Sequence, residues 1–201
     1  MVESGIAHMI EALGDHVNRY VEMTPDEVAA AAKHFTARSF AKGDFLVQEG
    51  DVCRDLAFVT RGSLRLYSID TNAKEHIVQF AFEGWWISDL YSFLAQEPTI
   101  YYIDALEPSE VLVIDRGGYD TVFAENPKFD RFFRVLLQNH LIATHRRIQA
   151  SLSLSAEEIY TTLLATYPEI PQRVAQRHIA SFVGITPESL SRIRKHLADS
   201  K

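Results

Sequence analysis

The sequence has a single cysteine, Cys53, among its 201 residues. One thiol excludes an internal disulfide framework, a zinc site made of thiolates alone and an iron–sulfur cluster held by several cysteines. The chain also lacks an apolar run near the ~20 residues that a membrane helix needs, and its N-terminus has no signal-peptide core. We therefore expect a cytoplasmic protein without a membrane segment.

Signals of catalysis and of cofactor binding are also missing. The glycines do not have the spacing of a phosphate-binding P-loop or of a dinucleotide fingerprint. The eight histidines are scattered without ligand spacing, and no set of nucleophile, base and orienting group is recognisable. We therefore do not expect an enzyme; the sequence gives no signal of a metal, haem or iron–sulfur cofactor, and the cofactor or effector stays unidentified. Cys53, in a predicted loop, is interpreted as a surface thiol, with a redox role as the alternative.

The composition is that of a folded protein with an uneven distribution of charge. Apolar residues make up 47% of the chain and charged residues 23%, which excludes wholesale disorder. The net charge is −7, yet residues 172–201 carry +4 and the rest of the chain carries −11. A basic end on an acidic body indicates that only this end meets a polyanion.

The first half of the chain predicts two helices followed by an antiparallel β structure. An amphipathic helix fits Ala7–Tyr20. Thr24 and Glu27 have the spacing of a capping box for a second helix, in which Pro25 takes the first helical position. From Phe40 to Ile114, short apolar runs alternate with glycines at intervals of roughly ten residues. This pattern is typical of an antiparallel sandwich or barrel. Without strand–helix alternation, a parallel dinucleotide-binding sheet is not expected.

A long helix is predicted between Lys128 and Ser151, which contain no Gly or Pro. Apolar residues and a few polar ones recur there at steps of three and four, namely Phe129, Phe132, Phe133, Leu136, Leu137, His140, Leu141, Thr144 and Ile148. The stripe has two interpretations: it packs against the protein's own sheet, or it pairs with a second copy of the chain. A further helix, capped by Ser155 and Glu158, must end before Pro168.

Ala175–Leu197 predicts two helices joined by a tight turn. Gly184 supplies the left-handed turn residue, Thr186 the N-cap and Pro187 the first residue of the second helix. Leu190, Ile193 and Leu197 then form the inward stripe of that helix, which packs on Ile179, Ala180 and Val183. This arrangement is a helix-turn-helix with an outward recognition helix.

The outward residues of this helix pair have the chemistry of DNA contacts. Arg192 can donate two hydrogen bonds to guanine, and Glu188 can accept one from a cytosine amino group. The other cations can bind phosphates. The predicted DNA-binding residues are Thr186, Glu188, Ser189, Ser191, Arg192, Lys195, Arg177 and Arg173. The alternatives are an ordinary helix pair with a solvated charged face, and a ligand-binding or scaffold module whose helix pair contacts protein.

Across nearly its whole length the chain resembles the cyclic AMP receptor protein/fumarate-nitrate regulator (Crp/Fnr) family of bacterial transcription factors. Glycine-marked turns at 42–46, 49–51, 59–62 and 82–84 look like those of the family's cyclic-nucleotide-binding β-roll, and residues 188–192 match its Glu-x-x-Ser-Arg pattern. The resemblance implies a dimerising helix at 128–151 and RNA polymerase as a partner. It also implies a β-wing after the recognition helix; the sequence ends four residues after Leu197, so we expect the wing's contacts to be missing.

The resemblance fails at the phosphate-binding motif of the β-roll. Aligned on the family, the glutamate that takes the ribose hydroxyl falls at Asp89, and the Arg-Ser pair falls at Thr99 and Ile100. No Arg or Lys occurs between Glu75 and Asp115. We therefore expect no useful binding of cyclic AMP or cyclic GMP. The candidate ligand pocket, for an apolar or neutral ligand, comprises Gly84, Trp86, Asp89, Thr99, Ile100 and Tyr101; the alternative is a filled core.

Together these observations predict an α+β protein. Residues 1–116 are expected to form N-terminal helices and a jelly-roll-like β-roll, residues 117–151 a long connecting and dimerising helix, and residues 152–201 a helix-turn-helix domain. The expected function is that of a homodimeric regulator that binds double-stranded DNA at an inverted repeat.

Overall fold

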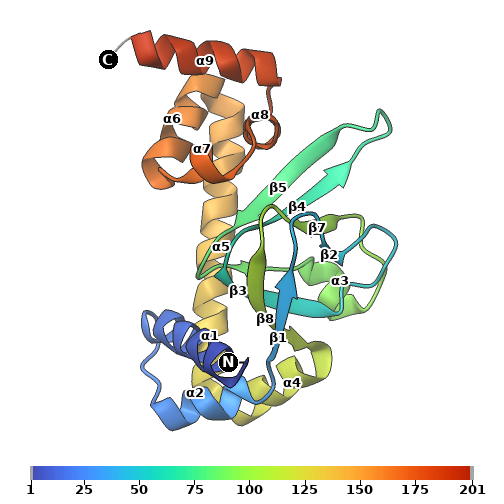
Figure 1. The fold of residues 1–201 in the computed structure, drawn as a ribbon, viewed down its shortest axis with the longest axis vertical. Coiled ribbons are helices and arrows are strands. Elements are labelled where there is room, and N and C mark those ends of the chain that lie inside the picture. Colours follow the sequence, from blue (N-terminus) through green and yellow to red (C-terminus); the bar gives the residue numbers. More distant parts are fainter. Residues whose placement is uncertain (1, 200–201) are drawn as a thin grey trace. The chain divides into compact units, whose positions relative to one another are not determined.

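The protein, seen here in a computed structural model that describes residues 2–199, divides into two compact units. The first unit comprises the chain up to Leu66 together with Phe80–Asn139. The second comprises Tyr67–Gln79 and the chain from His140 onward. The division differs from the expected boundary at 151/152, because it falls inside a helix and assigns a hairpin tip to the C-terminal unit. Figure 1 shows the elements of both units.

Two helices begin the first unit, as the sequence predicts. Helix α1 spans Val2–Asn18, a few residues earlier than expected, and α2 spans Pro25–Ala32. The capping box of α2 is present: the Thr24 hydroxyl accepts from the Glu27 N–H, and the Glu27 carboxylate accepts from the Thr24 N–H at 2.8 Å. The local capping chemistry therefore fixes where this helix begins.

In the described part of the chain, residues 2–199, eight strands form two four-stranded sheets, which confirms the expected antiparallel β structure. Their orders are β1-β8-β3-β6 and β2-β7-β4-β5. The strands are β1 Thr36–Phe40, β2 Phe45–Val47, β3 Asp55–Arg61, β4 Leu64–Ile69, β5 Glu75–Ala81, β6 Trp86–Ile87, β7 Tyr102–Ala105 and β8 Ser109–Asp115. A short helix, α3 (Leu90–Ala95), lies between β6 and β7. Glycine turns at positive φ join several strands, among them Gly62, whose added Cβ would lie 2.6 Å from the Pro108 carbonyl oxygen.

The core of the first unit joins these sheets to helices. Residues of α1, α2, β3 and β8 pack in one buried cluster with Phe129, Phe132 and Phe133. The aromatic contacts include Trp86 with Phe133, whose ring centroids are 5.4 Å apart. The interpretation of the long helix as a core element is therefore confirmed for its first turns.

The segment 117–151, expected as one helix, contains two. Helix α4 spans Arg116–Glu125 and α5 spans Pro127–Ser153, with Asn126 in an extended conformation between them. Pro127 explains the break, because proline disfavours the helical conformation of the residue before it while suiting a first helical position. Further along α5, Leu137, Leu141 and Ile148 are exposed, unlike the phenylalanines of its first turns.

The second unit contains the C-terminal helices. They are α6 (Ala156–Thr166), α7 (Ile170–Arg173), α8 (Gln176–Val183) and α9 (Pro187–Asp199). The predicted capping box of Ser155 and Glu158 starts α6, which ends two residues before Pro168. Hydrogen bonding at Ser155 lowers the pKa of Glu158, in keeping with this cap.

The interpretation of Cys53 as a surface thiol is wrong. The residue is buried, its Sγ lies 3.3 Å from the Ser88 hydroxyl, and its N–H donates to the Ser92 hydroxyl. Burial raises the pKa of the thiol. A loop position alone did not predict exposure, because the Cys53 loop packs on the start of α3. Between residues 2 and 199, no helix combines the length and the apolar character needed to cross a membrane.

Candidate nucleic-acid interface and β-roll site

Helices α8 and α9 are joined by the predicted tight turn. Gly184 has φ +85°, and its N–H donates to the carbonyl oxygens of Ala180 and Ser181. The Thr186 hydroxyl accepts from the Ser189 N–H at 3.2 Å, which caps α9. The apolar sides meet as expected: Ile179, Ala180, Val183 and Leu190 are buried, and Ile193 and Leu197 are partly buried. The turn chemistry and the inward stripe thus set the direction of α9.

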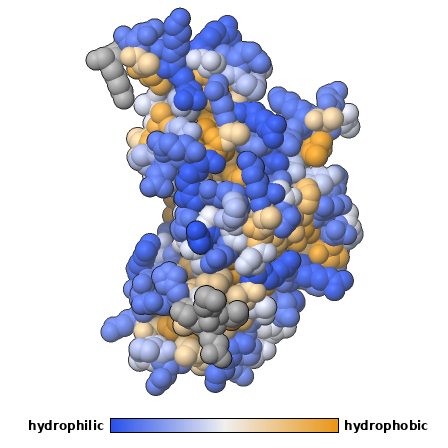
Figure 2. All heavy atoms as spheres, in the orientation of Figure 1, coloured by the Kyte–Doolittle hydropathy of each residue, from blue (hydrophilic) through white to orange (hydrophobic). Residues whose placement is uncertain are grey.

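The opposite face of α9 is polar and exposed. Glu188, Ser191, Arg192 and Lys195 are exposed, as is Thr186, and Ser189 is half-buried. In the view of Figure 2 the surface over α9 is mostly hydrophilic. Arg192 Nη2 donates to the Ser189 hydroxyl at 3.1 Å. The pKa of Glu188 is lowered, first by a hydrogen bond from its own N–H, then by Thr186 and the charge of Arg192. A carboxylate, a guanidinium and hydroxyl groups therefore face solvent from the first two turns of α9.

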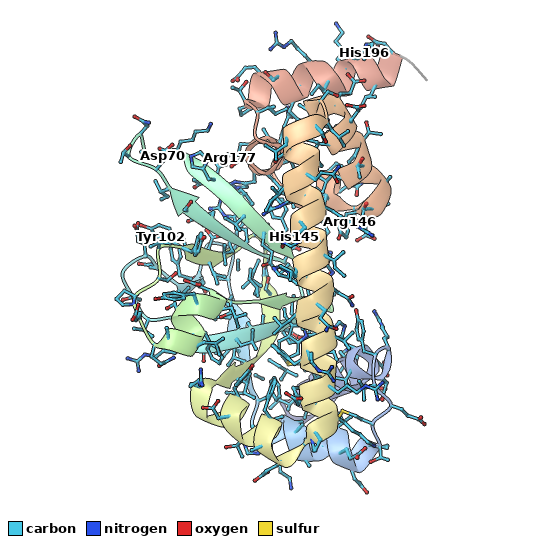
Figure 3. The ribbon with its side chains drawn as sticks, turned by 180° about the vertical axis from the view of Figure 1, so that it is seen from behind. Asp70, Tyr102, His145, Arg146, Arg177 and His196 are labelled. Carbon is cyan, nitrogen blue, oxygen red and sulfur yellow. The ribbon has the colours of Figure 1, made fainter. Side chains whose placement is uncertain are left out.

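The two predicted phosphate contacts outside α9 differ in their surroundings. Arg177 is exposed at the start of α8 and is labelled in Figure 3, together with His196 of α9. The Nε of Arg177 donates to His178 Nε2 at 3.4 Å. Arg173 is half-buried, and its Nη1 lies 3.7 Å from the Glu169 carboxylate one turn earlier. Arg177 is therefore the more accessible cation of the two.

The structure adds a contact between α8 and α9 that the sequence did not predict. Gln176 donates from Nε2 to the Pro187 carbonyl oxygen and accepts from Arg194 Nη1, both at 3.2 Å. The Gln176 side chain thus links two positions of α9, Pro187 and Arg194, to the first turn of α8. The only signal in the sequence was an amide next to the helix start, which many exposed helices also have.

The residues that align with the phosphate-binding motif form a closed hydrogen-bond set. Asp89 is buried and caps α3, because its Oδ1 accepts from the N–H groups of Tyr91 and Ser92. Its Oδ2 accepts from the Thr99 hydroxyl at 2.6 Å. Thr99 Oγ1 in turn accepts from the Tyr101 N–H at 3.0 Å. Asp89, Thr99 and Tyr101 are therefore brought together, and they bond to one another and to α3.

The other residues of the expected pocket are not part of this hydrogen-bond set. Trp86 belongs to the buried core cluster, with Phe58 at 5.2 Å between ring centroids. Gly84 forms a turn at φ +80° and donates to the Val59 carbonyl oxygen, and Ile100 is 64% exposed. This differs from the expected lining: Trp86 serves the core because β6 pairs with β3, which directs its ring toward α5.

A buried ion pair in the second sheet was missed. Arg65 of β4 donates from Nε to Asp104 Oδ1 at 2.7 Å and from Nη2 to Asp104 Oδ2 at 2.9 Å. Both side chains are less than 10% exposed. The sequence did offer a signal of this pair: one cation, Arg65, in an apolar strand, and one anion, Asp104, in another. Sequence alone did not show that β4 and β7 are neighbours.

Comparison with known proteins agrees with this architecture. Residues 37–126 match the model of the cyclic nucleotide-binding domain. The fumarate and nitrate reduction regulatory protein of Vibrio cholerae is 27% identical over 170 residues, which are 76% of this chain and 64% of that protein. The probable transcriptional regulator Flp of Lacticaseibacillus casei is 24% identical over 190 residues, covering 88% and 83% of the two chains.

Residues 37–126 belong to the cyclic nucleotide-binding domain family, and the chain as a whole is similar to regulators of the Crp/Fnr family. Among solved structures it is similar to the c-di-GMP-responsive global regulator CLP of Xanthomonas campestris, with a TM-score of 0.72, 17% identity and coverage of 88% of this chain and 93% of that one. Both curated relatives are regulatory proteins. The match to the cyclic nucleotide-binding domain ends at residue 126, so α8 and α9 lie outside it.

Proposed function

We propose that the chain is a homodimeric regulator that inserts one copy of α9 per subunit into the major groove of DNA. The observation that carries this proposal is the exposure of Glu188, Ser191 and Arg192 on one face of a helix whose other face is fixed by Leu190. Arg192 would pair with guanine O6 and N7, and Glu188 would accept from a cytosine amino group. Arg177, Lys195 and Arg173 would contact phosphates, as would the hydroxyl of Thr186, with Ser189 and Ser191 beside the bases.

The exposed part of α5 supports pairing of two copies. Leu137, Leu141, Thr144 and Ile148 follow one another at alternating steps of four and three, the heptad spacing of a coiled coil. Leu141 and Ile148 are each about half exposed. An apolar row on an exposed helix costs free energy in water, and a second α5 would cover it. A two-fold dimer then predicts two half-sites about 34 Å apart.

The β-roll is proposed to work without a cyclic nucleotide. A cyclic phosphate at the position of the aligned Arg-Ser pair would meet Thr99, whose hydroxyl is bonded to the buried Asp89 carboxylate. The segment from Glu75 to Asp115 offers no cation, and the buried Arg65 of β4 is held by Asp104. A buried anion beside another anion is strongly unfavourable. The residues present therefore do not fit a cyclic nucleotide.

Selection of bound duplexes from a random pool by the purified full chain tests the proposed function. We expect enrichment of an inverted repeat with half-sites about one helical turn apart. RNA polymerase as a partner is a further proposal from the family, tested by transcription from a promoter that carries the selected site. If no sequence is enriched even at low salt, the proposal is overturned, and a helix pair that contacts protein becomes the better interpretation.

A further inference from the structure

Strand β5 has an open edge, because it is the last strand in the order β2-β7-β4-β5. Within the second unit, Ser181 of α8 bonds to this edge twice. Its hydroxyl donates to the Glu75 carbonyl oxygen at 2.7 Å and accepts from the Ile77 N–H at 3.0 Å. Both bonds join residues more than a hundred positions apart in the chain. One side chain thus takes the place of a neighbouring strand at this point.

Further contacts of the same unit surround Ser181. The buried His178 lies one turn earlier on α8, and its Nδ1 is 3.4 Å from the Glu75 carboxylate. Arg147 of α5 donates to the Val78 carbonyl oxygen, and its guanidinium lies 5.1 Å from the centre of the Phe182 ring. Figure 1 shows α8 next to the hairpin formed by β4 and β5. Helix α8 is therefore held by the hairpin and by α5 together.

This attachment bears on the direction of α9. The Gly184 turn and the buried Leu190 fix α9 to α8, so whatever fixes α8 also fixes the recognition helix. The Ser181 hydroxyl is used by the β5 backbone and is not among the predicted DNA contacts. We propose that Ser181 is a positioning residue that sets the angle of the α8–α9 pair for DNA by capping the open edge of β5. This inference rests on the proposed function.

A positioning role predicts an effect on half-site spacing and not on base preference. Adding one base pair between half-sites turns one of them by about 35° and moves it by about 3.4 Å. A dimer with fixed recognition helices therefore favours one spacing. Once the two bonds of Ser181 are lost, α8 has more freedom and neighbouring spacings become acceptable.

The experiment measures the affinity of the full chain for its selected inverted repeat with spacers of −1, 0, +1 and +2 base pairs, and for a single half-site. For Ser181→Ala we expect the ratio between the best and the next spacing to fall by about fivefold, the factor that one hydrogen bond typically gives. Base preference within the half-site and affinity for the single half-site should not change. Ser181→Thr keeps the hydroxyl and is expected to restore the spacing preference.

The matched control is Ser153→Ala at the end of α5, where the hydroxyl donates to the Gln149 carbonyl oxygen one turn earlier in the same helix. Amide exchange at Ile77 should become faster in Ser181→Ala alone. If Ser181→Ala does not fold, Ser181→Cys, of similar shape but a weaker hydrogen-bonding group, is expected to give the same loss of spacing preference. A wild-type spacing preference that Ser181→Ala and Ser181→Cys both keep overturns the inference. A wild-type chain that favours no inverted repeat overturns the proposed function, and the inference with it.

Discussion

At the scale of single residues, His16 of α1 has the most unusual environment. It is 6% exposed, and neither ring nitrogen has a hydrogen-bond partner among the described residues. The rings of Tyr20, Phe58 and Phe132 lie 5.2–5.6 Å from its centre. Burial, and then the charge of Arg19, lower the pKa of His16 to about 4. The folded protein therefore holds this imidazole neutral.

The lowered pKa makes stability dependent on pH. Because the folded-state pKa is below the ordinary value of 6.5, the unfolded chain binds the proton more tightly, and stability is lost as the pH falls from about 6.5 toward 4. The loss reaches at most about 3 kcal/mol. In His16→Phe we expect this part of the pH dependence to disappear, as measured by urea unfolding at pH 7 and pH 4.5. His8→Phe, at an exposed position of the same helix, is the control and should keep it. An unchanged pH profile in His16→Phe would contradict the assignment.

Two cations of α9 are predicted to have different roles. Arg192→Ala should cost about 1–3 kcal/mol on the selected site and relax the preference at one base position. Lys195→Ala should weaken binding to all duplexes alike and reduce the slope of affinity against salt by about one. Titrations on specific and random duplexes at several salt concentrations separate the two. Equal losses on both duplexes for both variants would show that Arg192 does not contact bases.

At the scale of elements, α5 changes character along its length. Its first turns carry three buried phenylalanines of the core, whereas Leu141, Ile142, Ile148 and Leu152 are exposed. The periodic stripe of the sequence allowed two interpretations. In the structure, the first turns of the helix belong to the core and the rest of the stripe is exposed to water. The periodicity could not distinguish the two parts, because core packing and coiled-coil pairing require nearly the same spacing.

If the exposed stripe pairs two copies, a charge within it should separate them. We expect Ile148→Asp to shift the chain from dimer to monomer, because a buried unpaired carboxylate in a helix pair is costly. Sedimentation equilibrium over a range of concentrations measures the shift. Ile100→Asp is a matched control, since Ile100 is also exposed but lies outside α5. A chain that remains dimeric with Ile148→Asp would place the dimer contact elsewhere.

The ion pair between β4 and β7 is a second feature at this scale. Removing one partner leaves a buried charge uncompensated, so Asp104→Asn should destabilise the protein by about 3–5 kcal/mol. The double variant Arg65→Met/Asp104→Leu should lose less free energy of unfolding than Asp104→Asn, because no charge remains buried. Chemical unfolding of the three proteins gives the comparison. A double variant less stable than Asp104→Asn would show that the pair itself stabilises the sheet.

At the scale of the whole molecule, the sequence predicted features that depend on neighbouring residues better than features that depend on the pairing of distant strands. Capping residues placed the starts of α2, α6 and α9, and Gly184 placed the turn before α9, because these are short-range chemistry. The strands around Thr36, Tyr102 and Trp86 were not predicted individually, since their alternation is weak and their pairing is with distant residues. Likewise, Asp89 and Thr99 could be aligned as a pair in the sequence. Their direct hydrogen bond follows only from the fold.

For the whole molecule, the consequence we propose from the Asp89–Thr99 contact is independence from cyclic nucleotides. We expect affinity for the selected operator to be the same with and without cyclic AMP or cyclic GMP, because no cation in the aligned segment compensates the phosphate. Isothermal titration of the full chain with each nucleotide should give no binding in the low-micromolar range. Low-micromolar binding of either nucleotide would overturn this prediction.

The two bonds of Ser181 to β5 have one more consequence, for solubility. An uncovered edge strand exposes unpaired N–H and C=O groups, with which the same strand of another molecule can pair. By occupying Glu75 and Ile77, α8 blocks the start of such edge-to-edge stacking. The helix that we propose to position α9 is thus also expected to limit aggregation through this edge, and variants that release it should precipitate on storage before they unfold.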